Sequence, residues 1–112
     1  MRMFWHPTRK TITAAMEGVN DDAKGAAAIT LDRVNGRLCF KLAWSGIGSP
    51  IAAHIHKGSG PAVLSLFVDT PKRQGCVKAE KSLLRKIADC PGSYQVMLHT
   101  HRYPNDALRA QL

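Results

Sequence analysis

The stretch Val34-Asn-Gly-Arg-Leu-Cys-Phe-Lys-Leu-Ala-Trp44 carries the clearest structural signal in the chain. Its Asn35-Gly36 pair is typical of a type I′ turn between two antiparallel strands. After the turn, polarity partly alternates, and because side chains of a strand alternate between faces, one face receives the apolar residues Leu38, Phe40, Leu42 and Trp44. The stretch therefore predicts a half-buried strand that follows a hairpin turn.

Working outward, apolar and β-branched runs separated by Gly, Pro, Asn and Asp predict six more strands. They cover Thr11–Met16, Lys24–Asp32, Ile51–His56, Ala62–Val68, Tyr94–Thr100 and Ala107–Leu112. Between Val77 and Asp89 the apolar period becomes helical, with a stripe that ends at Pro91-Gly92. About seven short strands with one short helix are typical of an all-β sandwich.

Length and composition indicate one soluble domain. The chain has 112 residues, of which 45% are hydrophobic, enough for one core. We expect residues 11–112 to form this domain and residues 1–10 to be a disordered or cloning-derived extension, in which His6 has no role. Cations at positions 33, 37 and 41 interrupt the most apolar region, so no membrane span is expected.

The charge balance points to anionic partners without choosing one. Sixteen Lys and Arg against eight Asp and Glu give a net charge of +8. Six cations gather in one segment, at Lys72, Arg73, Lys78, Lys81, Arg85 and Lys86. No aromatic residue is interleaved there for base stacking, so we expect a solvated cationic face; nucleic-acid binding is not favoured, and binding to an anionic polymer stays open.

The three cysteines allow at most one internal disulfide. Cys39 lies in a predicted strand and Cys76 follows a turn region, and a bridge between them would stabilise the fold by about 3 to 4 kcal/mol. Such a bridge favours an oxidising compartment, secreted or periplasmic. Cys90 would then be a spare, half-buried thiol at a helix end. A Cys–His nucleophile pair is not favoured for Cys39, and no phosphate loop or serine-hydrolase elbow is present.

Four of the five histidines form two His-x-His pairs, His54/His56 and His99/His101. On a strand, residues i and i+2 project from the same face, so each pair could converge on one point. Imidazole is a good ligand for copper and zinc. A single pair could equally be part of a polar surface, but two pairs at the ends of apolar strands raise the case for a metal site.

The order of these segments resembles the CHRD domain, a family named after chordin and common in bacterial secreted proteins. The resemblance covers about residues 11–112. Its most specific blocks are Ala52-Ala53-His54-Ile55-His56-Lys57-Gly58 and the ending from His99-Thr100 to Ala107-Leu108-Arg109-Ala110-Gln111-Leu112. By this resemblance the recurring histidines are His54, His56 and His99, and His101 is an additional candidate.

The layout is also similar to a reduced Cu/Zn superoxide dismutase. That similarity implies an antiparallel Greek-key sandwich of about seven to eight strands, superoxide-dismutase-like or immunoglobulin-like, with one short helix. It implies copper held by His54, His56 and His99, with Arg109 attracting a small anion such as superoxide. The residues of the zinc half are missing, so the implied site is mononuclear, with copper preferred over zinc; a strand-edge charge is the alternative role of Arg109.

Two functions follow as expectations. The first is a secreted or periplasmic protein that binds one copper ion, either to handle copper or, as an enzyme, to dismutate superoxide. The second is an extracellular structural or protein-interaction module without a metal, in which the histidines only pack. Whether the protein is an enzyme is left open by the sequence.

Overall fold

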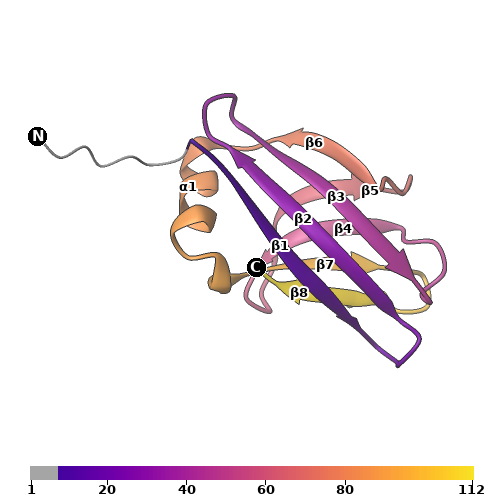
Figure 1. Ribbon diagram of the computed structural model, residues 1–112. Coiled ribbons are helices and arrows are strands. Elements are labelled where there is room, and N and C mark those ends of the chain that lie inside the picture. Colours follow the sequence, from indigo (N-terminus) through magenta and orange to yellow (C-terminus); the bar gives the residue numbers. More distant parts are fainter. Residues whose placement is uncertain (1–7) are drawn as a thin grey trace, which may run out of the picture.

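The computed structural model describes residues 8–112, which form eight strands, one α-helix and one short 3₁₀ turn (Figure 1). The prediction of an all-β protein with one short helix is confirmed. The elements are β1 (Arg9–Gly18), β2 (Lys24–Asp32), β3 (Arg37–Ser45), β4 (Ala52–Lys57), β5 (Ala62–Val68), β6 (Gln74–Lys78), α1 (Lys81–Asp89), η1 (Pro91–Ser93), β7 (Tyr94–His99) and β8 (Leu108–Gln111).

The strands form one continuous antiparallel sheet in the order β5-β4-β7-β8-β1-β2-β3-β6. The sheet folds over so that β1, β2 and β3 lie in front of β4, β5 and β7, as Figure 1 shows. Its edge strands, β5 and β6, contact each other, which makes the sheet a nearly closed barrel. The chain leaves β3 for the β4–β5 hairpin and returns to pair β6 with β3, which is a Greek-key connection.

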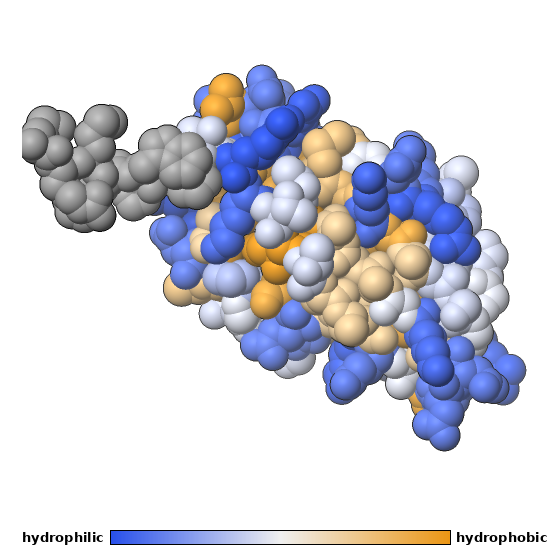
Figure 2. All heavy atoms as spheres, viewed as in Figure 1, coloured by the Kyte–Doolittle hydropathy of each residue, from blue (hydrophilic) through white to orange (hydrophobic). Residues whose placement is uncertain are grey.

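The core fills the space between the two halves of the sheet. On β3 the side chains of Leu38, Phe40 and Leu42 are buried, as their alternation predicts, while Trp44 at the strand end is partly exposed. Full burial of each such side chain stabilises the fold by about 1.5–3 kcal/mol. The outer face of the sheet around β1, β2 and β3 carries small residues. Figure 2 shows this face as a weakly hydrophobic area framed by hydrophilic residues.

The β2–β3 turn differs from the predicted type I′ turn. The strands pair as far as Asp32 and Arg37, which leaves a four-residue loop, and φ is positive only at Gly36 (64°). A type I′ turn needs positive φ at both central residues. The reason for the difference is Asp32, whose Oδ1 accepts the Asn35 backbone N–H (3.1 Å) and whose Oδ2 accepts the Asn35 side-chain amide (2.8 Å).

Asp32 should make stability depend on acid pH. Hydrogen bonds from the Asn35 side chain and backbone, and then from Arg37, lower the pKa of Asp32 from 3.8 to about 2. Because the pKa is lower in the folded chain, this stabilisation is complete above about pH 4 and is lost as the pH falls towards 2. Between about pH 2 and 4, we expect unfolding of the wild type to bind up to about one proton more than unfolding of the Asp32→Asn variant does. Urea unfolding between pH 2 and 6 tests this, and equal pH slopes would contradict it.

The Cys39–Cys76 disulfide is confirmed. The two cysteines are directly paired across β3 and β6, with Cα atoms 3.9 Å apart. They extend a cross-strand row that begins with Thr11 and Thr30, whose hydroxyl groups are 2.9 Å apart. Strand β6 was not predicted, because it is short and largely exposed and lacks a buried alternating face. The expectation of a half-buried Cys90 is wrong, since this thiol is exposed.

The helix α1 closes one end of the barrel (Figure 1). It begins at Lys81, later than the predicted change of period at Val77, because Val77 and Lys78 belong to β6 and Glu80 is the N-cap residue. Leu84 and Ile87 are fully buried on its inner face. The six cations of the basic segment are all exposed, as expected for a solvated face. Within the described residues no helix is both long and apolar enough to cross a membrane.

Candidate metal centre

Three histidines gather on the outer face of the sheet, at the neighbouring strands β4 and β7. His54 and His56 alternate with Ile55, which is fully buried in the core, so both imidazoles project from the opposite, outer face of β4. His99 is the last residue of β7 and pairs with Ala52, two positions before His54. The strand periodicity that buries Ile55 therefore brings the histidines to one side.

Irregular pairing between β4 and β5 accompanies the site. The register shifts twice, between Ala53 and His54 and again between Ile55 and His56. Extra residues in a strand bend it, increase its twist and change the direction of nearby side chains. By contrast, β4 pairs with β7 in unbroken register from Ala52 to Lys57. The histidines thus rest on one regular strand pair beside an irregular one.

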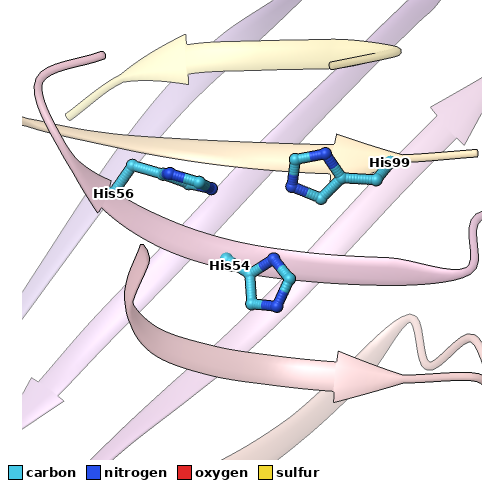
Figure 3. Close-up of side chains that lie close together, drawn as sticks. All are labelled: His54, His56 and His99. Carbon is cyan, nitrogen blue, oxygen red and sulfur yellow. The ribbon is translucent and has the colours of Figure 1, made fainter. Parts of the chain in front are cut away.

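The three imidazole rings face a common space (Figure 3). Their centroids are 5.8 Å apart for His54 and His56, 5.2 Å for His54 and His99, and 5.6 Å for His56 and His99. One ring nitrogen from each lies within 4.8 Å of the others. Nitrogens bound to one ion at about 2.0–2.1 Å lie about 3–4 Å apart, so a small closure of the side chains suffices to form a shared coordination sphere.

Backbone carbonyl groups fix two of the three rings. His56 Nδ1 donates to the carbonyl oxygen of Gly60 in the β4–β5 turn, and His99 Nδ1 donates to that of Pro104 in the β7–β8 loop, each at 2.9 Å. Because a carbonyl oxygen only accepts, both Nδ1 atoms carry the hydrogen, and in the neutral ring Nε2 keeps its lone pair. This second-nitrogen contact is the usual arrangement around metal-binding histidines.

The nitrogens left over are those that a metal would use. His54 Nδ1, His56 Nε2 and His99 Nε2 are buried and have no hydrogen-bond partner. Buried polar atoms are normally satisfied, because leaving one unpaired costs roughly 1–3 kcal/mol. Three unpartnered nitrogens around one point form a donor set that an ion would satisfy. The residues therefore fit a single metal ion.

The protonation of His54 also suits a ligand. Burial lowers the pKa of His54 below its usual value of 6.5, and its neighbours His99 and His56 lower it further. A lowered pKa keeps this imidazole neutral around pH 7, which is the form that coordinates a metal.

The comparison with protein families agrees with this architecture. A family model described as the CHRD domain matches residues 10–112. The chain belongs to the CHRD family. The same comparisons find no matching curated protein and no matching solved structure. The resemblance noted from the sequence is thus confirmed over nearly the whole chain, and CHRD domains are extracellular-type modules, to which the disulfide is well suited.

In this CHRD domain, the other two predicted site residues, His101 and Arg109, lie outside the group of three histidines. His101 is exposed beyond the end of β7 and is not among the three grouped histidines. Arg109, on β8, pairs with Met97, which pairs with His54, so Arg109 shares the histidine face two strands away. Its side chain is 58% exposed, and its Nη1 atom lies 3.5 Å from Asp106 Oδ2.

Sequence reasoning missed the two backbone carbonyl groups that orient the site. The turn carrying Gly60 is itself fixed, because the Gly58 N–H donates to the Ser93 carbonyl oxygen (2.7 Å) and the Gly60 N–H to that of Lys57 (3.0 Å). Gly58 adopts φ 57°, which glycine accepts without strain. The segment Lys57-Gly58-Ser59-Gly60-Pro61 predicted a turn, but it did not predict that the turn would orient a histidine. Only the folded chain brings its carbonyl group to His56.

Proposed function

We propose that this CHRD protein binds a single copper ion through His54 Nδ1, His56 Nε2 and His99 Nε2 and serves in copper handling. The observation that carries the proposal is that His54, His56 and His99 each have one buried, unpartnered ring nitrogen and each bring a ring nitrogen within 4.8 Å of the other two. The carbonyl contacts of His56 and His99 support it, since they select the tautomer that leaves Nε2 free.

Copper is favoured over zinc by the donor set. Imidazole suits both metals, but a given nitrogen site binds Cu²⁺ more tightly than Zn²⁺ in the usual affinity order. None of the three candidate ligands is a carboxylate or a thiolate, which zinc sites often contain. Three nitrogens also leave a fourth coordination position for another group.

Metal titration of the purified protein tests the proposal. We expect saturable binding of one equivalent of Cu(II), with a visible absorption band that saturates at the same ratio, and weaker binding of Zn(II). If neither metal binds saturably, the proposal fails, and a protein-interaction module in which the histidines only pack becomes the better account of the domain.

A secreted or periplasmic location belongs to the same proposal. The Cys39–Cys76 bridge supports it, because disulfides persist in oxidising compartments and are rare in the cytosol. CHRD membership supports it as well. Copper handling outside the cytosol would use a site of this kind without any catalytic step.

Superoxide dismutation is a second candidate, and the position of Arg109 favours it. The cross-strand row His54–Met97–Arg109 puts a guanidinium on the same face as the histidines, about 10 Å from His54 along the sheet. Bound copper would supply one-electron chemistry that oxidises one superoxide to dioxygen and reduces a second to hydrogen peroxide, with two protons consumed. Arg109 would attract the anion, although the carboxylates of Asp106 and of Glu17, the cross-strand neighbour of Arg109, partly offset its positive potential.

Substitution of Arg109 tests the second candidate. If the copper-loaded protein dismutates superoxide, Arg109→Ala should lower the rate constant by about tenfold at low ionic strength, the lower end of electrostatic steering effects. Copper affinity should stay unchanged, because Arg109 is not a ligand in the proposed site. Stopped-flow decay of superoxide gives the rate. Absence of activity in the loaded wild type rejects dismutation and leaves copper handling intact.

A further inference from the structure

Met97 lies at the centre of the residues that surround the histidines. It pairs directly with His54 on β4, and it precedes His99 by two residues on the same face of β7. Its neighbour Gln95 pairs with His56, so Met97 is diagonal to that histidine. Directly paired residues have Cβ atoms about 4.5–5.5 Å apart, and diagonal neighbours about 7–8 Å. No other described residue is adjacent to all three histidines in this register.

Met97 is buried, but not in the hydrophobic core. Its relative exposure is only 7%, yet it does not belong to the hydrophobic core cluster. On the same strand, Val96 and Leu98 supply the core contacts from the other face. Met97 is therefore buried on the histidine side of the sheet.

We infer that the Met97 thioether is a fourth ligand of the same ion and makes the site selective for Cu(I). This inference rests on the proposed function. Thioether sulfur is a soft ligand that favours Cu(I) over Cu(II) and over zinc. A flexible methionine side chain can also reach an ion from a paired position. A site with three imidazoles and one thioether is complete with four ligands, which suits holding and transferring copper better than turnover at an open position.

The experiment compares Met97→Leu with Met16→Leu, both in a Cys90→Ser background. Leucine keeps the volume and apolar character of Met97, so the fold should persist. Met16 is a buried core methionine and is the matched control. The Cys90→Ser background removes the exposed free thiol, which would otherwise bind Cu(I) itself. Cu(I) affinity is measured anaerobically by competition with a coloured chelator, and Zn(II) affinity by titration.

We expect Met97→Leu to weaken Cu(I) binding by about tenfold or more and to leave Zn(II) binding unchanged, with no effect from Met16→Leu. A tenfold loss of Cu(I) affinity alone would lower the copper reduction potential by about 59 mV, which voltammetry can measure. X-ray absorption of the Cu(I)-loaded background protein should show one sulfur neighbour, which disappears in Met97→Leu. The spectrum tests the inference even if the variant does not fold.

Equal Cu(I) affinities in Met97→Leu and the background protein, or a copper spectrum without sulfur, would overturn the inference while leaving the three-histidine site in place. Failure of the background protein to bind copper in either oxidation state would instead reject the proposed function itself. The two failures are thus separate results.

Discussion

Replacement of either His54 or His99 by alanine should weaken Cu(II) binding by at least about a hundredfold. Each supplies one of only three imidazole nitrogens, and loss of a mere outer-shell partner already costs about 10–100-fold in metal affinity. Both side chains project from the face of the sheet opposite the core, so their removal should not disrupt the fold. Competition titration with a chelator measures the affinity, and circular dichroism checks the fold.

His101→Ala is the matched control for these variants. It removes the same chemical group two residues from His99, but from an exposed position outside the histidine group. We expect its copper affinity to equal that of the wild type within about twofold. If His101→Ala weakened binding as much as His99→Ala, the ligand set would be wrong. If none of the variants changed the affinity, copper would be binding somewhere else.

His101 also shows where strand periodicity stops being a guide to the site. The i, i+2 rule correctly brings His54 and His56 to one face, because β4 continues through both residues. Applied to His99 and His101, the same rule predicts a second converging pair. Strand β7 ends at His99, however, and the chain turns into the loop in which Thr100 and Tyr103 hydrogen-bond each other, which leaves His101 exposed.

The fold was predictable wherever burial imposes an alternating pattern. Strands β2 and β5 agree with the predicted bounds, and the helical stripe with Leu84 and Ile87 is buried as expected. The pattern failed at β6, whose side chains are held by pairing with β3 and by the disulfide rather than by burial. It failed again at the Asn35-Gly36 turn, because the Asp32 carboxylate stabilises a longer loop.

The surroundings of the histidines depended on contacts that no local pattern encodes. The His-x-His pattern made both His99 and His101 candidates, and the family resemblance selected His99 as the third candidate ligand, since it is distant in sequence from His54. The carbonyl partners come from the Gly60 and Pro104 segments, and only loop closure brings them to the rings. The position of Met97 opposite His54 requires the register of β4 against β7. Alternation along a strand predicts the face from which a side chain projects, whereas the register between strands decides which side chains are its neighbours.

Removal of the disulfide should have the largest effect on stability. The bridge joins residues 37 positions apart and ties the edge strand β6 to β3. Restricting the unfolded chain over such a loop is worth about 3–4 kcal/mol, a large share of the roughly 5–15 kcal/mol that stabilises a domain. We therefore expect Cys39→Ser/Cys76→Ser to unfold at a temperature about 10–20 °C lower. Calorimetry measures the unfolding temperature, and Cys90→Ser, the control, should leave it unchanged. A double variant as stable as the wild type would mean that strand pairing alone holds β6 in place.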